Sequence, residues 1–243
     1  MVQLIEIAAG PRPQPEGPSS TLITDAEALA MARAAVNLFE DIADPADWDA
    51  LAAAEMKTNP RFAEALGELG LVPAERRVNG PGASWVMAAF THSSPDRPSR
   101  FADGTFGAYY AGDSFEVALA ETLFHHARFM RATAEPSGWT SDFRELVGTV
   151  DAELHDLRAD GYALCLDPDD YAVSQGLARH LRAGGSNGVV YPSVRQAGGQ
   201  CIAAFHPDVV GIPAQGRHLS YYWDGTRVSR IQDLTTGTVY EVS

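Results

Sequence analysis

The sequence predicts an α+β fold, with helices and strands mixed along the chain. Strand-like runs and helical patterns do not alternate regularly, as they would in a doubly wound parallel sheet. Several short runs rich in Val, Tyr and Trp are bounded by turn signals that contain glycine, which is typical of hairpins. The length of 243 residues and the hydrophobic content of 45% suffice for one large core, or for one domain with an extension.

Composition divides the chain into three predicted segments. Residues 1–20 are predicted to be a flexible arm, because GPRPQPEGPSS is rich in Pro, Gly and Ser. Residues 21–84 are predicted to be a helical extension that packs on the core. Residues 85–243, which contain the strand-like runs, are predicted to form the main domain.

The predicted extension contains three helical patterns. The first covers residues 24–42, where apolar side chains recur at helical spacing. The second begins with Asp44 as N-cap and Pro45 at the first helical position, a combination that favours helix initiation. Asn59 and Pro60 repeat that combination ahead of a third helix.

The main domain is predicted to contain strands and helices in irregular order. Asp113 and Glu116 form a capping box for a helix over about residues 114–131. The remaining predicted elements are strands at 84–92, 106–112, 146–157, 187–195 and 200–207, a helix at 171–185 that ends at glycines, and terminal hairpins at Asp224-Gly225 and Thr236-Gly237.

Charge and cysteine content exclude several classes of function. The net charge of −14 argues against general nucleic-acid binding, although a few local arginines can still hold a small anion. Cys165 and Cys201 have no zinc or redox spacing, and the histidines show no metal-binding pattern. No apolar run is long enough to span a membrane and no signal peptide is recognisable, so we expect a cytoplasmic protein without a metal centre.

Five residues of the main domain carry side chains suited to binding and cleaving a dinucleotide. The Arg100 guanidinium can form hydrogen bonds to phosphate oxygens, and Tyr110 can stack on a planar ring. Glu121 lies on the apolar face of the predicted helix, where an unpaired carboxylate is costly, and His125 shares that face. Ser193 follows a strand and can hydrogen-bond a phosphate or a ribose. Each also has a structural interpretation, such as a surface arginine, a core tyrosine or an ion-paired glutamate.

Motifs of other enzyme classes do not fit. Residues 184–188, GGSNG, match the nucleophile elbow G-x-S-x-G, but that motif needs a strand before the serine and a helix after it. A helix is predicted before Ser186 and a strand after it, so we reject a hydrolase with this nucleophile. The sequence contains neither a P-loop nor a G-x-G-x-x-G motif.

Three segments together resemble the RES-domain toxins, a family named for its Arg, Glu and Ser motifs. They are SRFADGTFGAYYAG with Arg100 and Tyr110, SFEVALAETLFHH with Glu121, and SNGVVYPSVRQAGGQCIAAFHP with Ser193. The three motifs occur in this order and with spacings that are fairly specific to the family.

The resemblance covers about residues 85–210 and implies a fold and an activity. The fold would be an ADP-ribosyltransferase-like split mixed sheet with flanking helices. NAD would be the substrate, with Glu121, Arg100 and Tyr110 in catalytic positions and with Arg100, Tyr110, His125 and Ser193 binding NAD. The nicotinamide–ribose bond would be cleaved by phosphorolysis, with inorganic phosphate as co-substrate, or by hydrolysis.

The resemblance also implies a biological role. The protein would be the toxin of a bacterial toxin–antitoxin pair, neutralised by an Xre-type helix-turn-helix antitoxin. The toxin could form a homo-oligomer within the toxin–antitoxin complex. It would bind neither nucleic acid nor a membrane directly. The alternatives are a mono-ADP-ribosyltransferase that modifies a cellular protein and a non-enzymatic interaction module.

One departure from the family pattern concerns the pyrophosphate. Many members carry another arginine on the strand upstream of the Arg-Phe pair, and residues 84–92 contain none. Arg76 and Arg77 precede this run without a clear alignment.

Overall fold

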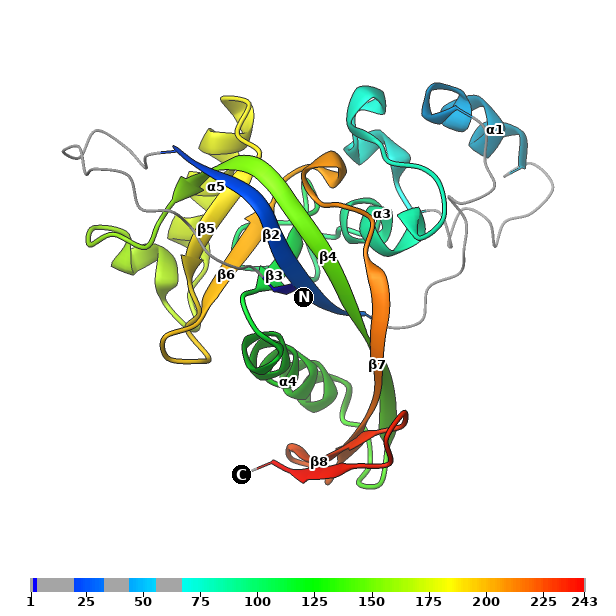
Figure 1. Ribbon diagram of the computed structural model, residues 1–243, viewed down its shortest axis with the longest axis vertical. Helices are drawn as coiled ribbons and strands as arrows, with labels where there is room; N and C mark the ends of the chain where they lie inside the picture. The colour runs from blue at the N-terminus through cyan, green and yellow to red at the C-terminus, as the bar shows by residue number, and fades with distance from the viewer. Residues whose placement is uncertain (1, 4–19, 33–43, 56–66, 243) are drawn as a thin grey trace.

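The structure, a computed structural model, describes residues 2–3, 20–32, 44–55 and 67–242 (Figure 1). Most of the arm predicted at residues 1–20, namely residues 1 and 4–19, and the third helix start at Asn59 lie outside these residues. The described strands are β1 (Val2–Gln3), β2 (Ser20–Ala32), β3 (Tyr109–Gly112), β4 (Thr140–Asp156), β5 (Gly188–Pro192), β6 (Gln200–Ala204), β7 (Ala214–Trp223), β8 (Val228–Asp233) and β9 (Val239–Glu241). The described α-helices are α1 (Trp48–Glu55), α3 (Ala83–Thr91), α4 (Phe115–Thr133) and α5 (Ala172–Ala183), and the 3-10 helices are η1 (Pro45–Asp47), η2 (Leu69–Leu71), η3 (Ala74–Arg76), η4 (Ala163–Leu166) and η5 (Pro207–Val209).

The described strands form one mixed sheet in the order β1-β3-β6-β5-β4-β7-β8-β9, with β2 paired to β3 and β4. Strand β4 joins its two halves and runs diagonally across the molecule in Figure 1. The first half of β4 pairs antiparallel with β7, whereas His155 and Asp156 at its end pair parallel with β5. The predicted α+β class with a split mixed sheet is therefore confirmed.

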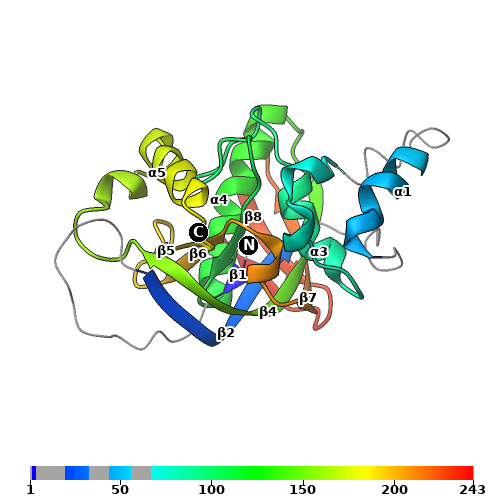
Figure 2. The ribbon, with the colours of Figure 1, turned by 90° about the horizontal axis from the view of Figure 1, so that it is seen from above.

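The helices pack on the sheet at separate places. In Figures 1 and 2 they follow one another across the molecule from α5 through α4 and α3 to α1. Three buried apolar clusters correspond to this arrangement: one contains Val86 and Phe90 of α3, a second contains Leu181 of α5, and a third contains Met130 of α4 with Tyr221 of β7. Helix α4 therefore lies between the two parts of the sheet that β4 connects.

The start of α4 differs by one residue from the predicted capping box. Ser114 is the N-cap, and its Oγ accepts a 3.2 Å hydrogen bond from the Val117 N–H. The predicted N-cap at Asp113 is therefore wrong, because the Ser114 hydroxyl satisfies the first turn. Glu116 lies in that turn, where a negative charge interacts favourably with the helix dipole. The helix ends at Ala134, which adopts a left-handed conformation with φ of 53°.

Residues 20–32 form strand β2, so the helix predicted from Thr24 is wrong where the structure describes it. Strand β2 pairs antiparallel with β4, with a register shift between Ile23 and Ala26. Pairing with a long neighbouring strand outweighs the weak local helix preference of this Ala-rich sequence. The extension is therefore not entirely helical, and its boundaries at residues 21–84 stay a prediction.

The strand predicted at residues 84–92 is also wrong, because Ala83–Thr91 form helix α3. A short apolar run does not by itself distinguish a strand from a buried helix. The buried side chains recur at helical spacing and are Ala83, Ser84, Val86, Met87, Phe90 and Thr91. The helical periodicity was thus present within the run.

The other predicted elements that the structure describes are confirmed. Helix α1 follows a turn in which the Ala46 N–H donates to Asp44 Oδ1 at 2.9 Å, as the predicted N-cap requires. Strands β3, β4, β5 and β6 and helix α5 overlap their predicted ranges. Strands β5 and β6 pair antiparallel, and the terminal hairpins turn near Gly225 and Gly237.

Candidate active site around Glu121

The centre of the site is the carboxylate of Glu121, in the middle of α4. The residue is 5% exposed, and its Oε1 accepts a 2.9 Å hydrogen bond from Ser193 Oγ. Cys201 Sγ lies 3.8 Å from the same oxygen. Burial raises the pKa of Glu121, while Ser193, Arg100 and Arg195 favour the charged form and offset only part of that rise. The carboxylate predicted on the apolar helix face is thus buried and hydrogen-bonded.

Ser193 lies directly after β5 and connects the β5–β6 turn to α4. Its Oγ accepts backbone hydrogen bonds from the Arg195 N–H at 3.2 Å and the Gln196 N–H at 3.1 Å. Because the backbone donors occupy its lone pairs, the hydroxyl proton is directed at Glu121. The serine therefore holds both the turn and the carboxylate.

Arg100 is buried between the loop before β3 and the segment that precedes α5. Its Nη1 donates to the carbonyl oxygens of Cys165 at 3.1 Å and Asp167 at 2.6 Å. The guanidinium carbon lies 4.8 Å from the ring centroid of Tyr171. Arg100 is 6% exposed, so it is not a surface arginine. Its charge lowers the pKa of Glu121 and therefore acts at the site.

Tyr109 and Tyr110 of β3 point to opposite faces of the sheet, as their alternation predicts. Tyr109 is buried with α3, and Tyr110 packs on the cluster that contains α5. Tyr110 Oη lies 2.7 Å from Ser99 Oγ and accepts a 2.8 Å hydrogen bond from the Phe101 N–H. Burial raises the pKa of Tyr110 to about 12, so the hydroxyl stays protonated. Tyr110 holds the loop that carries Arg100, and its stacking on a ligand stays a prediction.

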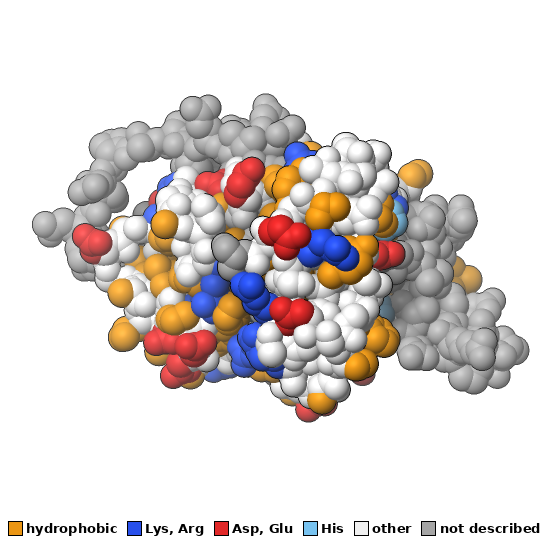
Figure 3. All heavy atoms as spheres, turned by 90° about the horizontal axis from the view of Figure 1, so that it is seen from below, with side chains coloured by type: hydrophobic (Ala, Val, Ile, Leu, Met, Phe, Trp, Pro, Cys, Tyr) orange, Lys and Arg blue, Asp and Glu red, His pale blue; other side chains and the backbone are white. Residues whose placement is uncertain are grey.

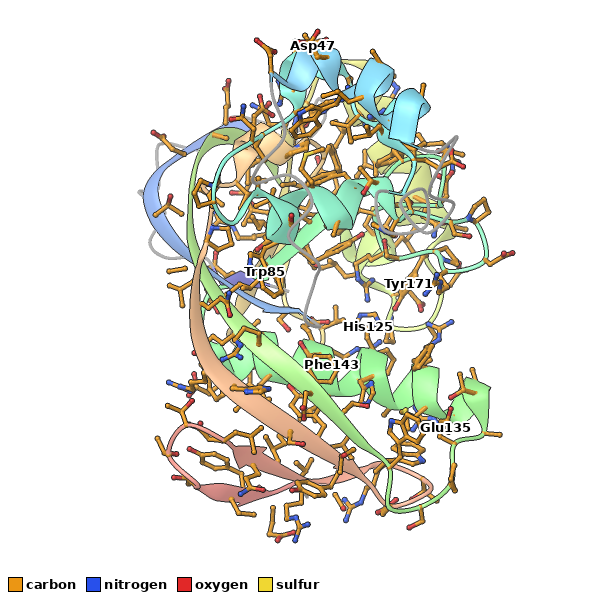
Figure 4. The ribbon with its side chains drawn as sticks, turned by 90° about the vertical axis from the view of Figure 1, so that its right-hand side faces the viewer. Asp47, Trp85, His125, Glu135, Phe143 and Tyr171 are labelled. Carbon is orange, nitrogen blue, oxygen red and sulfur yellow. The ribbon has the colours of Figure 1, made fainter. Side chains whose placement is uncertain are left out.

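His125 lies one helical turn after Glu121, with its Nε2 3.8 Å from Glu121 Oε2. Burial, followed by the charges of Arg195 and Arg100, lowers the pKa of His125 to about 4. The ring is therefore neutral at physiological pH and acts as a hydrogen-bonding group. Figure 4 shows His125 on α4 facing the segment that carries Tyr171.

Three further residues of the site were not predicted from the sequence: Arg195, Arg128 and Tyr171. The Arg195 guanidinium carbon lies 3.3 Å from the ring centroid of Phe124, and its Nη2 donates to the Pro168 carbonyl oxygen at 2.6 Å. Arg128 lies over the Tyr171 ring at 5.9 Å. Arg195 lies two residues after Ser193 in the sequence, but this position does not reveal the contacts that it makes.

The two arginines upstream of α3 are engaged elsewhere. Arg76 forms an ion pair of 2.8 Å with Asp208. Arg77 pairs with Asp49 of α1 at 3.1 Å. Neither stands in for the arginine that residues 84–92 lack, whereas Arg195 influences the site carboxylate directly.

Ser186 follows α5 and precedes β5, which is the reverse of the order in a nucleophile elbow. Its Oγ lies 2.9 Å from His155 Nδ1 and accepts the Gly188 N–H at 3.2 Å. The serine stabilises the turn between α5 and β5, and this order of elements does not fit a hydrolase with Ser186 as nucleophile.

The described residues were compared with the features expected of a metal site, a membrane-spanning helix and a basic surface. Within them, no group of three or more His, Cys, Asp and Glu side chains is placed to hold a metal ion. None of the described helices combines the length and apolarity needed to cross a membrane. On the face in Figure 3, arginine side chains occur among acidic and hydrophobic ones rather than as a continuous basic surface. Basic charge on this face is therefore local.

This arrangement combines two chemical capacities. Arg100 and Arg195 can bind an anion through charge-assisted hydrogen bonds. The Glu121 carboxylate can stabilise positive charge that develops nearby, and it does so more strongly in a buried site than in water. The Ser193 hydroxyl and the neutral His125 ring add polar groups without adding charge.

Comparisons with known proteins identify a matching family and two similar proteins. The RES domain family matches residues 74–224. An uncharacterized protein, y4oC, of Sinorhizobium fredii (strain NBRC 101917 / NGR234) is 30% identical over 201 residues, which is 80% of each chain. The crystal structure of the M. tuberculosis MbcT–MbcA toxin–antitoxin complex aligns with a TM-score of 0.34 and 17% identity, over 49% of this chain and 67% of that chain. Because the family match covers more than half of the sequence and includes all five predicted site residues, this protein belongs to the RES-domain family.

Proposed function

We propose that this protein is the toxin of a bacterial toxin–antitoxin pair and that it degrades NAD by cleaving the nicotinamide–ribose bond. The observation that carries the proposal is the buried Glu121 carboxylate, held by Ser193 and flanked by Arg100 and Arg195. A dinucleotide with a pyrophosphate and a cationic nicotinamide needs both an anion-binding group and a carboxylate. Membership of the RES-domain family supports the same assignment.

In the proposed reaction the bond between the ribose C1′ and the nicotinamide nitrogen breaks first. The bonding electrons leave with nicotinamide, which departs neutral, and the ribose acquires oxocarbenium character. Glu121 hydrogen-bonds the ribose hydroxyls and stabilises the developing charge at C1′. An oxygen of inorganic phosphate or of water then attacks C1′ and forms the new C–O bond, and water releases a proton in that step.

The other site residues bind and orient the substrate. Arg100 anchors the pyrophosphate, in keeping with a buried guanidinium that pairs with no carboxylate among the described residues. Tyr110 stacks on nicotinamide or closes the binding site. Its hydroxyl also holds the loop that carries Arg100, through the hydrogen bond from the Phe101 N–H. Ser193 orients the Glu121 carboxylate, and the neutral His125 ring hydrogen-bonds a ribose or phosphate oxygen.

We further propose that the cognate partner is an Xre-type helix-turn-helix antitoxin and that the toxin acts in the cytoplasm. Family membership is the support for this assignment. Expression of the protein alone should arrest growth, and co-expression of a small helix-turn-helix protein encoded next to it should restore growth. Growth that is unaffected by the protein alone would contradict the toxin role.

The enzymatic proposal is tested by incubating purified protein with NAD, with and without inorganic phosphate, and separating the products. We expect nicotinamide together with ADP-ribose, or with its 1″-phosphate when phosphate is present. Glu121→Gln should lower turnover by about 100-fold or more. Glu116→Gln is the matched control, because Glu116 lies exposed on the same helix. Label from NAD on a protein band would indicate the mono-ADP-ribosyltransferase instead, and intact NAD with folded protein would exclude both.

A further inference from the structure

Two arginines of the site have no acidic partner among the described residues, although the protein is rich in acidic side chains. The chain has 32 Asp and Glu against 18 Lys and Arg, yet neither Arg100 nor Arg195 lies within 4.0 Å of a carboxylate among the described residues. They contact ring faces and backbone carbonyls instead. Neither contact neutralises a guanidinium, so both keep their charge for a ligand.

One short backbone segment holds both guanidiniums. Arg100 donates to the carbonyls of Cys165 and Asp167, and Arg195 donates to the carbonyl of Pro168. Because Asp167 and Pro168 are consecutive, the two guanidiniums donate hydrogen bonds to neighbouring carbonyl groups of one segment. Each is thereby fixed in place before any ligand binds, which lowers the entropic cost of binding.

Each fixed guanidinium keeps donors that no described acceptor uses. Arg100 uses Nη1 for its two carbonyls, and Arg195 uses Nη2 for its one carbonyl. Nη2 of Arg100 and Nη1 of Arg195 therefore remain for a ligand. A diphosphate has two groups of anionic oxygens, and two planar guanidiniums that are held by carbonyl groups of consecutive residues can each bind one of them.

Arg195 is also tied to the carboxylate of the site. The turn that presents it is closed by Ser193, whose Oγ accepts the Arg195 N–H and donates to Glu121. The charge of Arg195 lowers the pKa of both Glu121 and His125. A phosphate bound at Arg195 would therefore lie close to the groups that act on the ribose.

From these contacts we propose that Arg195 is a substrate-binding residue that forms, together with Arg100, a two-arginine clamp for the diphosphate of the dinucleotide. This inference rests on the proposed function for the identity of the ligand. Arg128 is a weaker candidate because it is exposed, and none of the hydrogen bonds among the described residues fixes its guanidinium.

The test measures diphosphate binding separately from turnover. ADP-ribose, which keeps the diphosphate and lacks nicotinamide, should raise the melting temperature of the wild-type protein. In Arg195→Gln that rise should be lost, while the melting temperature without ligand changes little. Arg131→Gln is the matched control, because Arg131 is exposed on α4 and donates to the Thr226 carbonyl. It should retain the full rise with ADP-ribose.

Kinetics with NAD provide the second measurement. Arg195→Gln should raise KM by roughly 10- to 100-fold, the loss expected for a charged hydrogen bond, with a smaller change in kcat. Arg195→Lys should recover part of the loss, because it keeps the charge without the planar fork. If Arg195→Gln fails to fold, Phe124→Leu removes the stacking ring and should weaken ADP-ribose binding without removing the charge.

The outcomes separate this inference from the proposed function. ADP-ribose stabilisation that depends on Arg195, in a protein that leaves NAD intact, would support the clamp and overturn the NAD-degrading function. An unchanged ADP-ribose shift and an unchanged KM in Arg195→Gln would overturn the clamp. A wild-type protein that ADP-ribose does not stabilise would overturn it as well.

Discussion

Ser193 Oγ donates a 2.9 Å hydrogen bond to Glu121 Oε1 and thereby joins two residues that lie 72 positions apart. The same hydroxyl accepts the backbone N–H groups of Arg195 and Gln196, so its orientation is set by the β5–β6 turn. This bond brings the Glu and Ser motifs of the family together and places Arg195 beside them. It also gives the serine a positioning role that can be tested.

Replacement of Ser193 by alanine should leave Glu121 without its hydrogen-bond donor. The pKa of Glu121 should rise further, because burial remains and a group that lowers the pKa is removed. We expect turnover of NAD to fall by roughly 10-fold at pH 7, with partial recovery at higher pH as the carboxylate ionises. A pH–rate profile with the same midpoint as the wild type would show that Ser193 does not act through Glu121.

Replacement of Glu121 by glutamine should reduce turnover and stabilise the fold at neutral pH. Burial raises the pKa of Glu121, so the group contributes stability that is complete below its unfolded pKa and lost as pH rises through its folded pKa. Glutamine does not titrate and keeps an acceptor for Ser193. Urea unfolding at pH 4, 5.5 and 7.5 should give a stability advantage of the variant that grows with pH. If the variant instead becomes less stable than the wild type as pH rises, burial does not raise the pKa of Glu121.

Removal of the Tyr110 hydroxyl in Tyr110→Phe should loosen the loop that carries Arg100. The Phe101 N–H and the Ser99 hydroxyl lose their shared partner. We expect the free energy of unfolding to fall by about 1–3 kcal/mol, the cost of leaving a buried donor unsatisfied. Chemical denaturation measures this loss, and an unchanged stability would mean that the hydroxyl is not needed to hold the loop.

Gly107 lies where the chain passes close to α3, and an added side chain has no room. A Cβ at this position would lie 2.9 Å from the Phe90 carbonyl oxygen and closer to other backbone atoms of α3, which cannot move independently of the helix. Gly107→Ala should therefore lower the free energy of unfolding by about 1–3 kcal/mol. In the matched control Gly70→Ala, the Cβ meets nothing within 4 Å, and the change should stay within about 0.5 kcal/mol. Equal effects of the two substitutions would contradict this packing.

The elements that could be predicted from the sequence have boundaries fixed by local chemistry. The turn at Gly198 and Gly199 separates β5 from β6, and the Asp44 side chain caps the turn that leads into α1. In contrast, β2 was predicted as a helix because its Ala-rich sequence favours one, and only pairing with β4 makes it a strand. Helix α3 was missed because a short, almost wholly apolar run suits either structure.

The candidate site was predictable in part for similar reasons. Glu121 stood out because a carboxylate on an apolar helix face needs a partner, and the structure provides Ser193. Arg195 and Tyr171 could not be singled out, because their role depends on contacts with distant backbone and ring atoms. Their importance follows from three-dimensional proximity, which neither residue type nor spacing encodes.

We propose that Glu121 drives cleavage of the nicotinamide–ribose bond of NAD. The most direct measurement follows nicotinamide release from NAD by purified wild-type protein and by Glu121→Gln at matched concentrations, with folding of both verified by thermal unfolding. We predict that the wild type releases nicotinamide and that the variant, although at least as stable at pH 7.5, releases it at least about 100-fold more slowly. Equal rates in the two proteins, or no nicotinamide from the folded wild type, would contradict this role of Glu121.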